Sequence, residues 1–145
     1  MGMVVVHILQ YGLPSPLRTW RAPGILLAIS SDSNINPFLG ILRATTQQST
    51  LGENLSCEQP VVAYTQGGAC AESAEAIKGT LQLGRLADLT VLSQGIFSVP
   101  AAQLLAIRSV LTVLNGKTVC RAPRQMVRRT LLNHPYAGAR LAGSA

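Results

Sequence analysis

Asp32 is the residue whose type and position are best suited to catalysis. It follows the apolar run 25–29 and two serines. A short apolar run bounded by turn residues is typical of a strand buried on both faces. α/β folds place catalytic groups just past the C-terminal ends of such strands. Asp32 is therefore the candidate catalytic residue, and the competing interpretation is an Asx turn or a helix cap.

The other polar residues of catalytic type lack suitable partners. His7 lies within the apolar run 4–9 without a second ligand at metal-binding spacing, so a histidine satisfied on a strand face is favoured. His134 is expected to be solvated, and Asp88 to anchor a turn or loop. Ser30 and Ser31 lack the GxSxG motif of a nucleophile elbow.

The three cysteines form no CxxC pair, which excludes a disulfide framework and is typical of a protein in a reducing cytoplasm. The apolar N-terminus has no charged n-region and is shorter than a membrane span, so no membrane association is expected. The net charge of +6 comes largely from arginines near the C-terminus, and only 4% of residues are aromatic. Nucleic-acid binding is therefore disfavoured, although binding through the basic tail stays an alternative.

The chain has 145 residues, of which 48% are hydrophobic and only 12% are charged. This composition supports a packed core and predicts that another polypeptide, or a second copy of the chain, covers part of the surface. An isolated strand at 25–29 would have open sheet edges, which predicts self-association.

The pattern of apolar and turn residues divides the chain into four segments. Residues 1–23 form an N-terminal extension with a short strand at 4–9. Residues 24–76 contain the strand at 25–29, a helix that begins at Pro37, and a second helix that follows a capping box of Ser56 and Gln59. The pair Gly67 and Gly68 within this second helix indicates close packing against another element.

The third segment, residues 77–121, is predicted to be a small β-rich module. Leu81 and Leu83 alternate with polar residues as in a strand, and a second, buried strand is expected at 89–92. A short helix is predicted at 100–107. Asn115 and Gly116 then form the strongest hairpin signal, because both turn positions require a positive φ. Residues 122–145 are predicted to be a loose basic tail.

Three stretches, taken in order, resemble one enzyme family: GILLAISSDSNINPFLG, AYTQGGACAESAEAIKGTLQLGRLADLTVL and VLTVLNGKTVC. They resemble the final barrel strand, the following helix, the Gly-Lys-Leu-Ala-Asp-Leu segment and the closing hairpin of metal-dependent amidohydrolases of the amidohydrolase 3 family. The similarity extends over residues 24 to 121.

The resemblance implies an α/β fold made of the last strand-helix unit of a TIM-like barrel and a small β-rich, composite sandwich module, incomplete relative to the family's full fold. It also implies that Asp32 both binds a divalent metal, usually zinc, and handles the proton of the hydrolytic water. The family's histidine ligands have no counterparts in this sequence. One carboxylate does not hold a catalytic zinc, so the isolated chain is expected to bind no metal.

The implied function is that of the C-terminal part of a hydrolase that acts on non-peptide carbon–nitrogen bonds of a small amide, inactive as an isolated chain. Its expected partners are the missing barrel segment or further copies of itself. The alternatives are a non-catalytic assembly or interaction module derived from this family, and the basic-tail binder of nucleic acid described above.

Overall fold

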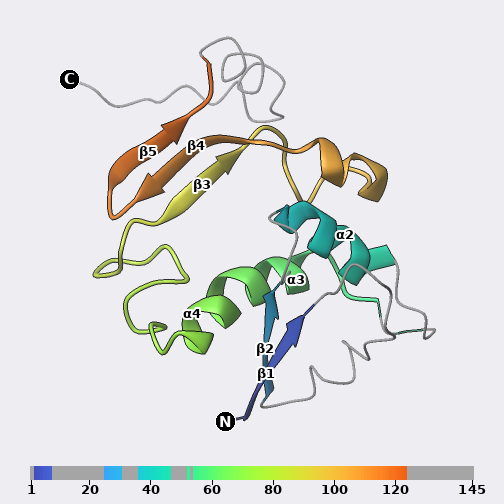
Figure 1. Cartoon of the computed structure of the whole chain (residues 1–145), viewed down its shortest axis with the longest axis horizontal. Coiled ribbons are helices and arrows are strands. Elements are labelled where there is room, and N and C mark those ends of the chain that lie inside the picture. The colour runs from blue at the N-terminus through green and yellow to red at the C-terminus, as the bar shows by residue number, and fades with distance from the viewer. Residues whose placement is uncertain (1, 8–24, 31–35, 47–51, 53, 124–145) are drawn as a thin grey trace.

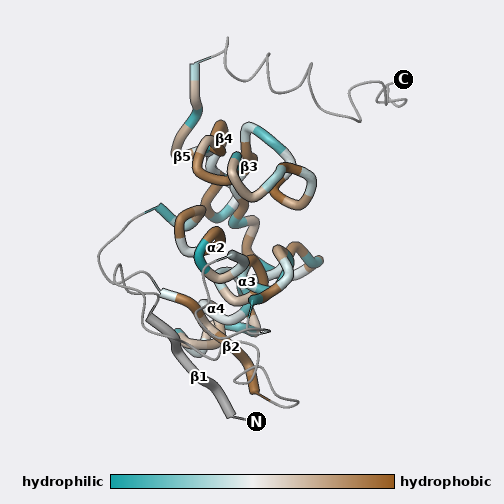
Figure 2. Tube along the Cα trace, turned by 90° about the vertical axis from the view of Figure 1, so that its right-hand side faces the viewer, coloured by the Kyte–Doolittle hydropathy of each residue, from teal (hydrophilic) through white to brown (hydrophobic). Residues whose placement is uncertain are grey.

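The computed structural model describes residues 2–7, 25–30, 36–46, 52 and 54–123. They form a mixed α/β arrangement in which helices lie between a two-stranded parallel sheet and a three-stranded antiparallel sheet (Figures 1 and 2). No helix in these ranges is long and apolar enough to cross a lipid bilayer.

The parallel sheet joins β1 (Gly2–His7) to β2 (Ile25–Ser30). The register is continuous over six residue pairs, from Gly2 opposite Ile25 to His7 opposite Ser30. β1 contains three valines and β2 two isoleucines, and β-branched residues of this kind favour the extended backbone. The strand predicted at 25–29 is confirmed. The one predicted at 4–9 is confirmed over residues 4–7, begins at Gly2, and has its last two predicted residues outside the described ranges.

The burial of β2 also agrees with the prediction. Leu27, Ala28 and Ile29 are consecutive and all buried. Because successive strand residues point to opposite faces, the middle of this strand is covered on both faces.

Helix α2 (Pro37–Thr46) begins at the predicted residue. The side-chain oxygen of Asn36 accepts a hydrogen bond from the Phe38 backbone N–H at 3.1 Å. Proline suits the first helical position because its missing N–H would have no partner within the helix. Asn36 and Pro37 together therefore define the start of α2.

The second predicted helix consists of α3 (Glu58–Val62), the π-helical turn η1 (Ala63–Gly67) and α4 (Gly68–Ala71). The Gln59 side chain of the capping box accepts a hydrogen bond from the Ser56 N–H at 2.9 Å. The π-helical turn was not anticipated, since the residue pattern predicted an ordinary helix.

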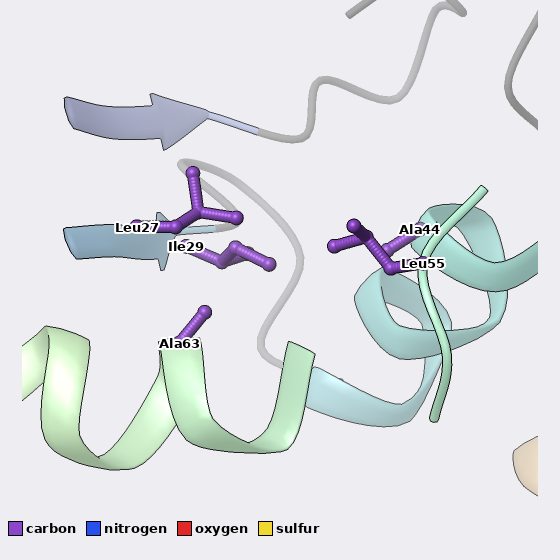
Figure 3. Close-up of a cluster of buried hydrophobic side chains, with 5 residues drawn as sticks. All are labelled: Leu27, Ile29, Ala44, Leu55 and Ala63. Carbon is purple, nitrogen blue, oxygen red and sulfur yellow. The ribbon is translucent and has the colours of Figure 1, made fainter. Parts of the chain in front are cut away.

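One hydrophobic cluster connects β2 to the helices around it (Figure 3). Ala63 faces β2 from η1, while Ala44 of α2 and Leu55 pack at the other end of the cluster. The Leu55 N–H donates to the Ala44 carbonyl at 2.9 Å, which connects Leu55 to α2. The cluster consists of Leu27, Ile29, Ala44, Leu55 and Ala63.

The antiparallel sheet has the order β3 (Leu89–Leu92), β4 (Ser109–Leu114) and β5 (Lys117–Arg121). The predicted turn is confirmed: Asn115 has φ +48° and Gly116 has φ +74°. A short 3-10 helix, η2 (Ala101–Ala106), lies within the range predicted as helical. β3 is only partly buried, because Thr90 and Val91 are exposed.

The strand predicted around Leu81 and Leu83 is wrong. Both side chains are exposed, at 70% and 106%, and the segment contains turns, bends and irregular backbone but no strand. Gly79 and Gly84 have φ values of +93° and +84°, which interrupt any extended run. The Arg85 guanidinium donates to the carbonyls of Glu75 and Lys78, so an arginine rather than a neighbouring strand satisfies these backbone groups.

A second hydrophobic cluster joins α2 to the segment around η2. It places Ile41 of α2 among residues far along the chain, so the helical layer contributes to the cores on both of its sides. The buried members are Ile41, Ile96, Leu104 and Ile107.

Candidate functional site

The candidate site is the carboxyl end of the parallel sheet. Parallel pairing brings the last residues of both strands, His7 and Ser30, to the same level. Asp32 comes two residues after Ser30, in the connection between β2 and α2, and lies outside the described residues. The structure therefore confirms the strand that precedes Asp32, while the role of Asp32 stays a prediction.

The position of His7 next to the candidate site was not indicated by the sequence. It is the last residue of β1, directly opposite Ser30, and so it occupies the same sheet end from which the Asp32 connection departs. Only the parallel pairing of β1 with β2 reveals this position. Linear spacing could not, because 22 residues separate Ser30 from His7 in a sequence of this length.

β2 is held on its side away from β1 by the helix that contains η1. A Cβ atom added to Gly67 would lie 2.1 Å from the Leu27 carbonyl oxygen and 3.0 Å from the Ala28 Cα. Strand carbonyls point sideways within the sheet, so this contact lies at the edge of β2. In Figure 3, β1 and the helix accordingly lie on opposite sides of β2.

The close packing predicted for the pair Gly67 and Gly68 is therefore found at Gly67 alone. Gly67 fits because it has no side chain, whereas a Cβ at Gly68 would meet nothing within 4 Å. The contact at Gly67 fixes the distance between helix and strand near the start of the Asp32 connection.

Tyr64 links this helix to α2. Its hydroxyl lies against Gly40, where an added Cβ would be only 2.1 Å from the oxygen. The hydroxyl is buried and has no hydrogen-bond partner among the described residues. Burial raises the pKa of Tyr64, because the charged phenolate would lose its hydration. Tyr64 therefore stays protonated and acts as a packing residue between the two hydrophobic clusters.

Two other polar groups have structural roles. The Asp88 carboxylate accepts a hydrogen bond from the Asn115 backbone N–H at 2.7 Å, which confirms its interpretation as a turn anchor. The Cys57 thiol donates to the Ile96 carbonyl at 3.4 Å. Burial, and secondly the charge of Glu58, raise the pKa of this thiol, so it lacks the thiolate character of a nucleophile.

A groove of about 610 Å³ lies between the helix and the antiparallel sheet. The ion pair of Glu72 with Lys78 is at its border. Its lining among the described residues includes none from β2. Its walls include Val61, Tyr64, Ala69, Leu89, Thr112 and Leu114.

The family resemblance implies a divalent metal. A catalytic zinc takes three protein ligands. Within the part of the chain that the structure describes, no three His, Cys, Asp or Glu residues come together in a way that could hold a metal ion.

Comparisons with known proteins give a consistent result. The model of the amidohydrolase family matches residues 4–120. The chain is 33% identical over 114 residues to YtcJ of Bacillus subtilis (strain 168), a protein named as an amidohydrolase, covering 70% of this chain and 22% of that protein. It is 34% identical over 98 residues to imidazolonepropionase of Hyphomonas neptunium (strain ATCC 15444), covering 62% of this chain and 24% of that protein.

No solved structure matches the chain significantly. The chain spans less than a quarter of the length of these two curated relatives. The family match covers more than three quarters of the chain and includes most of β1 and β5 and all of the elements between them. The chain therefore belongs to the amidohydrolase family.

Proposed function

We propose that this chain is the C-terminal part of an amidohydrolase that hydrolyses a non-peptide carbon–nitrogen bond in a small amide or cyclic amide. Family membership suggests hydrolase activity. The chain supplies Asp32 to the active site, and a second polypeptide segment supplies the remaining catalytic groups. Alone, the chain is inactive.

The observation that carries this proposal is the family match over residues 4–120, combined with the short share of each relative that the chain covers. The parallel register supports it. β1 and β2 run side by side in the same direction with a long connection between them, as consecutive strands of a TIM-like barrel do. In such barrels the catalytic groups follow the carboxyl ends of the strands, where Asp32 occurs.

The chemistry assigned to Asp32 is proton transfer. A carboxylate at the mouth of the sheet takes a proton from the attacking water and returns it to the nitrogen that leaves. His7 and Ser30 are the last paired residues at this carboxyl end of the sheet. The described residues form no metal site, so any zinc or other divalent ion of the complete enzyme would depend on histidines outside this chain.

The test is reconstitution. Co-expression with a barrel segment that carries the family's His-x-His pair should give a complex that hydrolyses small amides. Asp32→Asn should abolish turnover while the complex still assembles, because the amide does not act as a proton acceptor. Asp88→Asn is the matched control, since its side-chain oxygen still accepts the Asn115 N–H and activity should be retained. Full activity of Asp32→Asn would refute the assignment.

A non-catalytic assembly module derived from the family is the second candidate. It is favoured by the absence of a three-ligand metal cluster among the described residues. If no segment bearing the His-x-His pair is encoded upstream, and elemental analysis finds no metal in the purified chain, this candidate replaces the first. A complex with stoichiometric metal would dismiss it.

A further inference from the structure

Gly67 brings the helix that contains η1 into direct contact with the backbone of β2. A Cβ atom at this position would lie 2.1 Å from the Leu27 carbonyl oxygen and 3.0 Å from the Ala28 Cα. Packed proteins keep Cβ atoms at least 3.0 Å from their neighbours, so a methyl group here forces helix and strand apart by about 1 Å. Both contacted atoms belong to the backbone, so no change of rotamer relieves the contact.

The helix has little room to move away from β2. Residues two positions from Gly67 lie on nearly the opposite side of a helix, and one of them, Ala69, is packed against Gly79. A Cβ atom at Gly79 would be 2.8 Å from the Ala69 Cβ. The Tyr64 hydroxyl lies against Gly40 of α2, which limits movement in a further direction. A larger residue at position 67 therefore displaces β2 rather than the helix.

A displacement of β2 reaches the candidate site through the chain itself. Leu27 is three residues before Ser30, at which β2 ends, and Asp32 follows two residues later. The strand between them is buried at Ala28 and Ile29, and packed interiors transmit strain. A catalytic group that is misplaced by about 1 Å loses about 100-fold in rate.

We infer that Gly67 is a positioning residue for the proposed hydrolysis. Its missing side chain sets the distance between the helix and β2, and this distance determines where the carboxyl end of β2 presents Asp32. Gly67 has no side chain, so it acts only through the position of the strand. The inference rests on the proposed function, because it concerns the geometry of the active enzyme.

The test is steady-state kinetics of the complex between this chain and the barrel segment that carries the His-x-His pair. Gly67→Ala should lower kcat by about 100-fold and leave KM unchanged, because the substrate still binds while the proton acceptor is misplaced. Gly68→Ala is the matched control. Gly68 has helical angles and an added Cβ there meets nothing within 4 Å, so this variant should keep the unmodified rate.

A purely structural role of Gly67 predicts a different result. It lowers the amount of folded complex, but not the kcat of the complex that has folded. The rates are therefore expressed per assembled complex, with the folded fraction measured by circular dichroism. An unchanged kcat per folded complex in Gly67→Ala would overturn the inference.

Asp32→Glu tests whether the effect of Gly67 passes through the catalytic carboxylate. Its side chain is one methylene longer, so it moves the carboxylate without moving β2. If Gly67 positions Asp32, the rate losses from Gly67→Ala and Asp32→Glu should not multiply in the double variant. Losses that multiply would show that the two residues act independently, which overturns the inference.

Ala63→Val decides the question if Gly67→Ala does not fold. Ala63 is four residues earlier on the same helix and packs with Leu27 and Ile29 in one cluster. Its added methyl groups meet side chains that can adjust, so kcat should fall less than in Gly67→Ala, again at unchanged KM. An active complex in which Ala63→Val keeps the unmodified kcat, or changes KM alone, overturns the inference and leaves the proposed function intact. An inactive unmodified complex overturns the proposed function, and this inference with it.

Discussion

The two sheets of this molecule are stabilised in different ways, and their glycines show it. In the antiparallel sheet, Gly116 is required for its backbone angle, φ +74°, in a turn that joins neighbouring strands. In the parallel half, Gly67 has ordinary helical angles of φ −61° and ψ −45° and is required only because β2 lies so close. The antiparallel sheet therefore depends on the local conformation of its turn, whereas the parallel sheet depends on close packing between elements that are distant in the chain.

This difference bears on the candidate site. The hairpin of β4 and β5 closes over two turn residues and is anchored by Asp88 from the segment just before β3. The β1–β2 pair joins strands separated by residues 8–24 and is supported by α2 and η1. The end of the sheet from which Asp32 follows is therefore the part whose geometry depends most on long-range packing.

The largest loss of folding stability is expected from Gly67→Ala. Alanine suits the helical angles, but its Cβ would be 2.1 Å from a backbone oxygen that cannot move without shifting β2. Overpacking of this kind costs about 1–3 kcal/mol. The matched control is Gly68→Ala, which has the same helical conformation and open space, so it should stabilise the chain by about 0.5–1 kcal/mol. Urea unfolding measures both, and equal stability of the two variants would contradict the contact.

The outcome of the sequence predictions follows the same division. The turn at Asn115 and Gly116, the start of α2 at Pro37 and the strand at 25–29 were predictable, because each depends on the conformational preference of a few adjacent residues. These features are encoded within windows of a few residues.

Features that depend on distant residues were missed. The alternation of Leu81 and Leu83 resembles a strand, but Arg85 folds this segment into turns by bonding the carbonyls of Glu75 and Lys78. The placement of His7 beside Ser30 needs the parallel pairing, and the Tyr64 contact needs Gly40 of α2. No single-residue preference encodes these partners, so neither the site's neighbours nor the π-helical turn could be read from the pattern.

A smaller loss of stability is expected from a substitution in the turn of the antiparallel sheet. Asn115 has φ +48°, a conformation that costs most L-residues about 1–2 kcal/mol and that asparagine and glycine adopt more readily. Asn115→Ala should therefore destabilise the chain by about 1 kcal/mol, whereas Asn115→Gly should be close to neutral. Thermal unfolding distinguishes them. If Ala and Gly behave alike, the backbone angle is not what stabilises this turn.

The smallest change in stability is expected from the ionisation of Tyr64 at alkaline pH. Burial raises its pKa in the folded chain above the ordinary value of 10.0, while the unfolded chain keeps that ordinary value. As the pH rises above 10, the unfolded state therefore loses the phenol proton first, and stability falls until the folded pKa is reached. The slope is at most about 1.4 kcal/mol per pH unit.

Tyr64→Phe should lack this loss. The difference in unfolding free energy between the two proteins should be constant below pH 10 and should shift in favour of the phenylalanine variant above it. Cys57, whose pKa is also raised, is present in both proteins and cancels in the comparison. Parallel pH profiles would mean that the Tyr64 hydroxyl is hydrated in solution, and that the contact between η1 and α2 at Gly40 is looser than the buried arrangement requires.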